Sequence, residues 1–340
     1  MRTDLSSQRP VVLTGDRTTG PLHLGHLAGS LRTRTRLQHE AEQFVMLADA
    51  QALTDHAGRH RLVTESVVEV ALDYLAVGID PRLSTIFVQS QVPQLAELTQ
   101  LLLNFVSVAR LERNPTVREE IRLRGFARDI PAGFLVYPVS QAADITAFKA
   151  SLVPVGSDQL PMIEQANELV ARFNRAVGSP VLVHCEALLS DVPRLPGIDG
   201  KAKMSKSAGN AILLKDEPEA IRDAVQRMYT DPQHLRVDDP GHVEGNVVFA
   251  LLDAFDADTA GLHELKARYR RGGLADSAVK RRLEALLQEQ LRPIREARRR
   301  LAADKAQVLA ILAEGTSRAR ERAEATMGEV RRALGLRYFD

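Results

Sequence analysis

The sequence predicts an α/β fold, with a parallel sheet in the first domain and a smaller helical domain at the C-terminal end. In the first half of the 340-residue chain, short apolar runs alternate with amphipathic stretches. This alternation is typical of strands joined by helices that cover both faces of a parallel sheet. From about residue 215 the short apolar runs stop and helical periodicity dominates. We therefore expect two domains, over residues 1–200 and 201–340.

Four apolar runs are expected to form the strands, because each is short and ends at a small or polar residue. The runs are PVVLTG (10–15), FVMLAD (44–49), TIFVQS (85–90) and LVPVG (152–156). In open parallel sheets of this Rossmann-like type, ligands bind beyond the carboxyl ends of the strands. The chemistry is therefore expected beside Gly15, Asp49, Ser90 and Gly156.

The stretches between these runs predict helices. Leu24, Leu27 and Leu31 have helical spacing directly after the first strand. In the second half, residues 278–301 carry apolar side chains three and four positions apart, which predicts a core-facing helix with a kink at Pro293. The other helices of the first half are expected over residues 61–78, 94–113, 140–150 and 158–175.

The composition excludes several classes of protein. With 44% hydrophobic residues, 26% charged residues and a net charge of +1, the chain is an ordinary globular protein and not a histone-like one. Its single cysteine, Cys185, excludes a disulfide framework and a cysteine-based zinc or iron–sulfur site. The first ten residues lack an apolar signal segment, and no stretch has the length of a membrane span. We expect a cytoplasmic protein without a membrane partner.

A local excess of positive charge lies in the second half. Residues 266–300 contain 12 lysines and arginines against 4 acidic residues. Such a run is either a solvated helix face or a surface that contacts the phosphates of RNA. In the second case Arg298, Arg299 and Arg300 would contribute to RNA binding.

The segment GPLHLGHLAG (20–29) follows the first strand and carries two histidines, His23 and His26, at the start of a helix. Gly25 between them leaves room for a flat group close to the backbone. Free amides at a helix N-terminus, together with the helix dipole, favour phosphate. Two histidines at this spacing are more often surface or capping residues. In the context of strand, glycine turn and helix, they predict an ATP-phosphate site that lacks a Walker-type loop.

The segment KAKMSKSAGN (201–210) has three lysines, no acidic residue and no apolar periodicity. It predicts a mobile loop. A lysine cluster alone is usually solvated, and the alternative is a cationic arm that closes over phosphates.

These two segments resemble the paired signatures of class I aminoacyl-tRNA synthetases. His23-Leu24-Gly25-His26 is similar to a pattern that usually reads His-Ile-Gly-His, and residues 203–207 match Lys-Met-Ser-Lys-Ser at all five positions. Further stretches are similar to bacterial tryptophanyl-tRNA synthetases, and the likeness covers nearly the whole chain. These stretches are LAVGIDP (75–81), YPVSQAADI (137–145), VPVGSDQ (153–159) and ARFN (171–174).

The resemblance implies an activity, substrates and partners. Such enzymes activate L-tryptophan with ATP to tryptophanyl-adenylate and pyrophosphate, and then transfer it to tRNA(Trp). ATP is a substrate that acts with Mg²⁺, and neither a tightly bound cofactor nor a metal held by side chains is implied. A homodimer that binds tRNA is expected, and DNA is not an expected partner. Because the attacking carboxylate is already ionised, the reaction needs alignment and charge neutralisation and no general base.

The resemblance also implies roles for individual residues. The implied catalytic residues are His23, His26, Lys203 and Lys206. The implied ATP-binding residues are Arg17, Thr18, Thr19, Gly25, His26, Gly156, Ser157, Asp158, Leu195, Lys203, Met204, Ser205, Lys206 and Ser207. The implied tryptophan-binding residues are Asp144, Tyr137, Gln141, Val153, Val155 and Gln159. Asp144 would accept the indole N–H, since a buried carboxylate needs a donor.

Several departures leave alternatives open. Gln141 stands where the better-known bacterial enzymes carry methionine, and Tyr-x-x-x-Gln-x-x-Asp also occurs in the tyrosine enzymes. The small pair Ala142-Ala143 favours tryptophan, because it leaves room for two fused rings. Arg17 replaces a glutamine and Arg118 replaces a lysine.

The alternatives are a tyrosine–tRNA ligase or a paralogue that binds RNA or a protein after losing catalysis. Small nucleotidyltransferases share the histidine pattern but lack the lysine loop.

Overall fold

The computed structural model contains one five-stranded sheet in the part of the chain that it describes. The described residues are 9–126, 129–190, 192, 194–201, 203–206 and 208–339. The strands are β1 (Val11–Arg17), β2 (Glu42–Ala48), β3 (Ser84–Val88), β4 (Leu152–Val155) and β5 (Glu186–Leu189). All neighbouring strands are parallel, in the order β3-β2-β1-β4-β5. The expected α/β fold with a Rossmann-like parallel sheet is therefore confirmed.

The sheet differs from the prediction at one edge. The four expected strands are present, and β1 continues two residues beyond Gly15 to Arg17. The fifth strand, β5, has no counterpart among the predicted elements. It lies at the edge of the sheet and its four residues are only partly buried or exposed. A strand with little burial does not need an apolar run, and its sequence therefore gives no strong signal.

Helices cover the sheet and form the second half. In the first half they are α1 (Leu24–His26), a π-helical turn (Leu27–Leu31), α2 (Arg32–Leu37), α3 (Asp49–His56), α4 (His60–Ala76), α5 (Pro93–Leu102), α6 (Val108–Glu112), α7 (Pro115–Arg124), α8 (Ala132–Ala147) and α9 (Leu160–Val177). In the second half they are α10 (Pro218–Gln226), α11 (Val247–Phe255), α12 (Thr259–Arg271), α13 (Asp276–Ala303) and α14 (Lys305–Ala333). Within the described ranges, no helix combines the length and apolar character needed to cross a membrane.

The helix expected over residues 94–113 is interrupted. After α5 the chain makes a 3₁₀ turn over Leu103–Phe105 and then becomes extended at Val106. Ser107 starts α6, because its hydroxyl accepts a hydrogen bond from the Arg110 N–H and so caps the new helix. The apolar periodicity continues across this break, and for that reason it predicted one helix instead of two.

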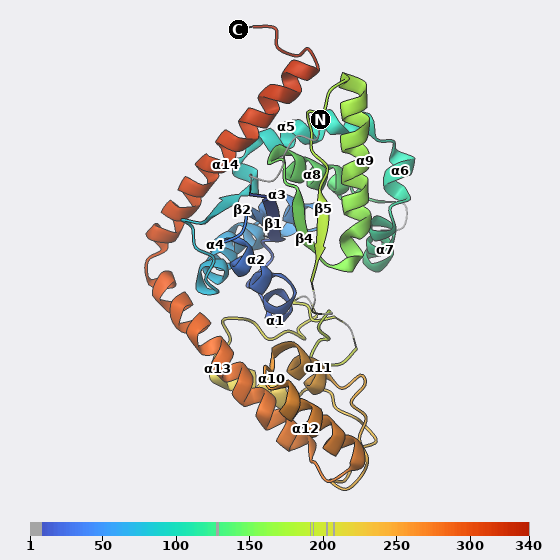
Figure 1. The fold of residues 1–340 in the computed structure, drawn as a ribbon, viewed down its shortest axis with the longest axis vertical. Coiled ribbons are helices and arrows are strands. Elements are labelled where there is room, and N and C mark those ends of the chain that lie inside the picture. Colours follow the sequence, from blue (N-terminus) through green and yellow to red (C-terminus); the bar gives the residue numbers. More distant parts are fainter. Residues whose placement is uncertain are drawn as a thin grey trace, which may run out of the picture.

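The helical second half extends away from the sheet and then returns to it (Figure 1). Helices α10–α13 form a separate lobe below the sheet, and α14 runs back along the sheet side. The apolar side chains of Ala319, Ala323 and Met327 on α14 belong to the same buried cluster as Phe87 of β3. The division at residue 200 stays a prediction, to which the structure adds that the last helix packs on the first lobe.

A buried carboxylate joins this second half to the start of the histidine segment. Asp73 of α4 is fully buried, and its Oδ2 accepts the Leu22 N–H at 2.6 Å. Its Oδ1 accepts from Arg298 Nε of α13 at 2.7 Å. The Arg298 guanidinium also donates to Glu69 Oε2 at 2.8 Å. One carboxylate therefore fixes the position of three segments that are far apart in the sequence.

The expectation that Arg298 contacts RNA is wrong, because its side chain is buried and engaged in this network. Other cations of residues 266–300 also have acidic partners. Lys266 pairs with Asp253, Arg270 with Glu244, Arg282 with Asp256 and Arg299 with Glu217. With Arg271, which pairs with Glu264, and Arg298, six of the twelve cations of this segment thus have acidic partners.

Replacing Arg298 with alanine should lower the free energy of unfolding. It leaves the Asp73 carboxylate buried without its charged partner, a change that typically costs about 3–5 kcal/mol. Chemical denaturation would measure the loss. Arg300→Ala, two positions along the same helix at an exposed site, is the matched control and should change stability little. Equal stability of the two variants would contradict a structural role for the Asp73–Arg298 pair.

Candidate active site

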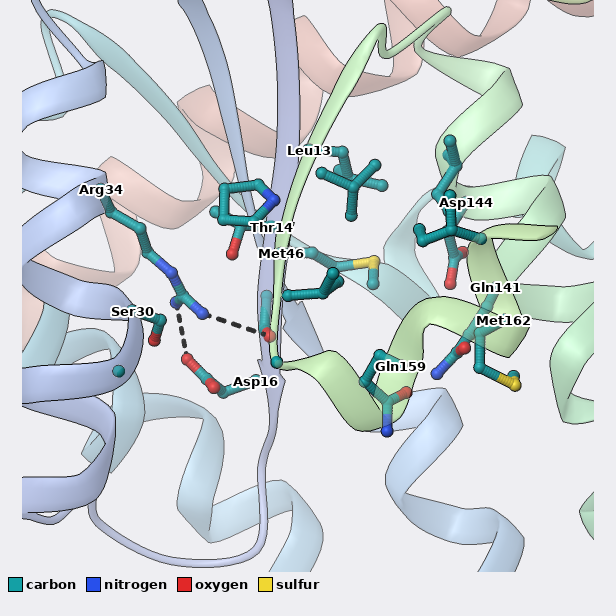
Figure 2. Close-up of a pocket in the computed structure, with 18 residues that line it drawn as sticks. Leu13, Thr14, Asp16, Ser30, Arg34, Met46, Gln141, Asp144, Gln159 and Met162 are labelled. Carbon is teal, nitrogen blue, oxygen red and sulfur yellow. Dashed lines mark hydrogen bonds and ion pairs between the residues drawn. The ribbon is translucent and has the colours of Figure 1, made fainter. Parts of the chain in front are cut away.

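A cavity of about 350 Å³ lies between β1 and β4. In a parallel sheet with this strand order, the order in which strands are added reverses between β1 and β4, and ligands bind in the crevice at that point. Gly15 and Gly156, two of the expected strand ends, line this cavity. Asp49 and Ser90 do not line this cavity. The Ser90 hydroxyl instead donates to the Asp49 carboxylate at 2.5 Å at an exposed position. Figure 2 shows the cavity between the Asp16–Arg34 side and the Asp144 side.

A second cavity of about 280 Å³ adjoins the first. Gly15, Met46, Gln141, Asp144 and Gln159 line both, so the two cavities are parts of one cleft. The first part is mainly apolar. The second part is more polar and reaches the side chains of Tyr137, Arg17, Asp158 and Lys203. The cleft therefore offers an apolar compartment beside a charged one.

Asp144 of α8 lies at the junction of the two compartments, with 2% of its surface exposed. Both of its oxygens accept from Gln89 Nε2, at 3.1 and 2.9 Å. The other end of the Gln89 amide accepts the Gln51 N–H at 2.9 Å, which holds its NH₂ group toward the carboxylate. Burial raises the pKa of Asp144 to about 7, and the neutral amide of Gln89 opposes this only in part.

Gln89 was missed by the sequence analysis. It stands at the carboxyl end of the third predicted strand, where that analysis singled out the neighbouring Ser90. The signal that could have identified it is its position beyond a buried strand, but nothing local shows that it faces Asp144.

The structure brings the six expected tryptophan-binding residues to one cleft. Asp144, Gln141 and Gln159 line both compartments, as Figure 2 shows for the apolar one. Val153 and Val155 of β4 line the apolar compartment, and Tyr137 lines the polar one. Leu13, Met46 and Met162, which the sequence analysis did not select, complete the apolar walls. Such a wall fits an aromatic ring, and Asp144 is the polar group at its end.

The two histidines form a compact unit at the start of α1. His23 is the N-cap residue, and its Nδ1 accepts the Gly25 N–H at 3.1 Å. The His26 Nδ1 accepts the His23 N–H at 3.3 Å, which completes a reciprocal cap. The ring centroids are 4.0 Å apart. A side chain at position 25 would bring its Cβ within 2.9 Å of the His23 ring, so the ring can fold back only over glycine.

Both histidines are neutral near pH 7. Burial, with the nearby positive charge of Lys206, lowers the pKa of His23 to about 2 and that of His26 to about 4. Each ring can therefore carry one N–H as a hydrogen-bond donor without adding a fixed positive charge.

A buried ion pair supports the histidine unit from below. Arg34 of α2 donates to Asp16 Oδ2 at 2.6 Å, and the Tyr74 hydroxyl donates to the same oxygen at 2.8 Å. His26 Nε2 lies 4.0 Å from the other Asp16 oxygen. Burial alone would raise the pKa of Asp16, but Arg34 and the hydrogen bonds hold it well below its usual range. Asp16 is therefore a fixed negative charge beneath His26.

The lysine loop is closed over the histidine segment in its described residues. Lys206 Nζ donates to the Gly20 carbonyl at 2.8 Å, and Gly20 has a φ of +113°, a conformation that favours glycine. Burial lowers the pKa of Lys206. Immediately after the loop, the Leu24 N–H donates to the Ile212 carbonyl at 3.0 Å. The backbone of residues 212–214 thus links the two sequence signatures directly.

The loop has its own internal support. The buried side chain of Asn210 accepts the Ser205 N–H at 2.8 Å and donates to Asp199 at 3.1 Å. Met204 is buried, and its N–H donates to the Leu195 carbonyl at 3.0 Å. The described residues of the loop are thus held by a buried asparagine, and the mobility of the loop stays a prediction. Ser207, one of the expected ATP-binding residues, lies outside the described residues.

The remaining expected nucleotide residues surround the polar end of the cleft. A third cavity of about 850 Å³ continues outward from it and is lined by Arg17, Ser157, Asp158, Lys203 and Ser205. Thr18 is buried and Thr19 is partly buried in the turn after β1, and Leu195 lies in the core beneath the loop. The first five of these residues therefore line the outer cavity, whereas Thr18, Thr19 and Leu195 do not belong to its lining.

Arg118, expected near phosphate in place of a lysine, is exposed on α7. It is absent from the lining of the third cavity, where Arg124 at the end of the same helix takes part instead. The α7 residues that line this cavity include Thr116, Glu119, Glu120 and Leu123, which follow one face of the helix, and Arg118 does not belong to that face.

The described residues contain no group of three His, Cys, Asp or Glu side chains placed to hold a metal ion. The cleft instead combines an apolar compartment, the Asp144 carboxylate at its end, and the cations Arg17 and Lys203, with the two neutral histidines beside it. This set can bind an aromatic amino acid beside a polyphosphate and stabilise negative charge between them.

Known proteins match the chain over nearly its whole length. Residues 5–292 match the family model described as tRNA synthetases class I (W and Y). A tryptophan–tRNA ligase of Clostridium longisporum is 56% identical over 336 residues, covering 98% of each chain. A tryptophan–tRNA ligase of Streptococcus pyogenes serotype M3 is 54% identical over 338 residues, covering 97% of this chain and 99% of that protein.

A solved structure agrees with these relatives. The tryptophanyl-tRNA synthetase of Campylobacter jejuni, crystallised with ADP and tryptophan, has a TM-score of 0.82 and 29% identity, covering 96% of this chain and 99% of that one. The expected resemblance is confirmed by sequence and by fold. The chain belongs to the class I tRNA synthetases of the tryptophan and tyrosine family, and the two relatives above, 54–56% identical to it, are bacterial tryptophan–tRNA ligases.

Proposed function

We propose that this protein is a tryptophan–tRNA ligase that activates L-tryptophan with ATP and transfers it to tRNA(Trp). The observation that carries the proposal is the single cleft in which Asp144 faces an apolar compartment and Lys203 lines the polar one. The histidine unit lies beside this cleft, with His26 Nε2 4.0 Å from the cleft-lining Asp16. The near-full-length likeness to tryptophan–tRNA ligases supports the same conclusion.

In the proposed reaction, the tryptophan carboxylate attacks the α-phosphorus of ATP, the bond to the leaving pyrophosphate breaks, and the aminoacyl-adenylate forms. His23 and His26 donate hydrogen bonds to phosphate oxygens from neutral rings, and Lys203 and Lys206 neutralise charge on the triphosphate. Lys206 Nζ donates to the Gly20 carbonyl. A phosphate is a stronger partner for an ammonium group than a carbonyl, so ATP would take this lysine over.

The nucleotide is expected to contact the glycine turn, the start of α9 and the lysine loop. We assign these contacts to Arg17, Thr18, Thr19, Gly25, Gly156, Ser157, Asp158, Leu195, Met204, Ser205 and Ser207. ATP arrives with Mg²⁺ on its phosphates, as part of the substrate.

Tryptophan is proposed to lie in the apolar compartment with its indole N–H on Asp144. Val153 and Val155 face the ring, and Tyr137, Gln141 and Gln159 lie toward the polar compartment. A site that holds a buried acceptor for an N–H rejects side chains that lack this donor. The enzyme is expected to act in the cytoplasm as a homodimer that binds tRNA.

The protein itself permits a direct test, because it contains five tyrosines and no tryptophan. Excited at the red edge of tyrosine absorption, free tryptophan should shift its emission to the blue and gain anisotropy when the protein is added, since the indole becomes immobilised in an apolar site. Tryptophan should also support pyrophosphate exchange into ATP. An unchanged emission spectrum, with exchange supported by tyrosine, would replace tryptophan by tyrosine as the substrate.

Lys206→Ala should reduce the kcat of tryptophan-dependent pyrophosphate exchange on the order of 100-fold, because a preorganised charge donor to the transition state is lost. Tryptophan affinity, measured by the same fluorescence titration, should stay the same. Lys201→Ala, an exposed lysine of the same loop, is the control and should keep its kcat. A Lys206 variant with normal kcat and weakened tryptophan binding would exclude this role.

The affinity for tryptophan should rise with pH through about 7, where Asp144 loses its proton. The ionised carboxylate is the better acceptor for the indole N–H, so binding favours the deprotonated form. Asp144→Asn should give a flat pH profile between pH 6 and 8 and weaker discrimination against phenylalanine. If the variant keeps the wild-type pH dependence, another group is responsible for it.

A further inference from the structure

A buried carboxylate at the mouth of the cleft gathers two arginines from distant parts of the chain. Asp55 of α3 has only 1% of its side chain exposed. Its Oδ2 accepts from Arg17, the last residue of β1, at 2.9 Å, and the same oxygen pairs with Arg124, the last residue of α7. His56 Nδ1 lies 2.6 Å from the other oxygen. Asp55 has no assigned role in the proposed reaction.

Each arginine of this cluster is held at one edge of its guanidinium group by the Asp55 carboxylate. The Arg124 guanidinium also lies 5.9 Å from the centre of the Phe134 ring, which lines the polar compartment. Phe134 in turn packs edge-on against Tyr137, with ring centroids 5.5 Å apart. The cluster therefore continues, through direct contacts, into the wall of the cleft. Long arginine side chains lose much of their freedom when they are held in this way.

The free sides of both arginines face the nucleotide end of the cleft. Arg17 and Arg124 line the third cavity together with Lys203, and Arg17 also lines the polar compartment. Their side chains are 41% and 33% exposed, while the carboxylate between them is hidden. A guanidinium presents five donors, so one edge can bind a carboxylate while another binds phosphate. Two arginines on one carboxylate leave an excess of one positive charge within this cluster. The same cavity is also lined by Glu119, Glu120 and Asp158, of which Glu119 pairs with Arg122 and Asp158 with Arg194.

Asp55 itself stays ionised. Burial would raise its pKa, but Arg17, the hydrogen bond from His56 and Arg124 together lower the pKa below its ordinary value. A permanently charged anchor keeps the two guanidinium groups in place before any ligand arrives. Groups that are already oriented bind a developing or fixed negative charge without the cost of reorganising.

We propose that Asp55 is a positioning residue that holds Arg17 and Arg124 as a pair for the polyphosphate of ATP. Asp55 does not touch the nucleotide. It sets the separation and orientation of two cations, one from the sheet and one from α7, so that both donate to the phosphates at the mouth of the cleft. This inference rests on the proposed function, and it adds Asp55 and Arg124 to the residues that serve ATP binding.

The test compares Asp55→Asn with Asp80→Asn. Asparagine keeps the size of the side chain and removes its charge. Asp80 lies before β3, at the opposite end of the strands from the cleft, and pairs with the exposed Arg82, so its replacement removes an aspartate–arginine pair away from the site. We would measure ATP affinity by calorimetry, KM for ATP and for tryptophan in pyrophosphate exchange, and the midpoint of thermal unfolding.

Asp55→Asn should weaken ATP binding and lower kcat/KM for ATP by about 10- to 100-fold, since displacement of a positioned group by about 1 Å can cost on the order of 100-fold. KM for tryptophan should not change, and Asp80→Asn should behave as the wild type. Arg17→Ala should reduce ATP affinity less in the Asp55→Asn variant than it does in the wild-type protein, because Arg17 has already lost its orientation in that variant.

Two results would overturn the inference. Unchanged ATP affinity in Asp55→Asn, with or without a lower unfolding midpoint, would make the cluster a structural tie between α3 and α7. Tighter ATP binding would make Asp55 a competitor of phosphate. The calorimetric result decides this point even if the wild-type protein shows no exchange with tryptophan, a failure that would instead contradict the proposed function.

Discussion

The carboxylate of Asp73 is the point on which the arrangement of the site depends. One of its oxygens holds the backbone amide of Leu22, just before the histidine unit, and the other holds Arg298 of the C-terminal half. Leu22 also accepts the Leu214 N–H at 3.0 Å, so the segment that follows the lysine loop is tied to the same residue. The histidine turn, the lysine loop and the long helix α13 therefore share one buried anchor. Removing one partner of a buried pair of this kind leaves the other charge uncompensated. The three segments therefore stabilise one another through the same pair.

Three buried carboxylates of the cleft differ in their partners, and this difference separates their chemistry. Asp16 and Asp55 face arginines, which lower their pKa values and keep them charged. Among the described residues, the hydrogen-bond partner of Asp144 is the neutral amide of Gln89, and burial raises the pKa of Asp144 to about 7. A carboxylate without a charged partner is the one that gains most from a ligand donor. The partner of each carboxylate thus distinguishes structural and positioning charges from the acceptor offered to substrate.

The two compartments of the cleft follow from the order of the strands. Because β1 and β4 are parallel neighbours at the point where the strand order reverses, their carboxyl ends open side by side. Val153 and Val155 of β4 contribute apolar walls, while β1 continues into the glycine turn and ends at Arg17. One pair of strands therefore supplies an apolar surface for an aromatic ring and a charged surface for phosphates. Helix α8, which carries Tyr137, Gln141 and Asp144, closes the space between them.

The sequence alone determined the α/β class, four of the five strands, and the two signatures at residues 23–26 and 203–207, because local periodicity and short motifs depend on neighbours in the chain. It also identified Asp144 and the residues around it through resemblance to a known family. Only the tertiary structure decided that Gln89 binds Asp144, that Arg298 is buried against Asp73, and that Arg124 instead of Arg118 reaches the cleft. These contacts join residues tens to hundreds of positions apart, and the pairing of a buried charge depends on which distant group the fold brings to it.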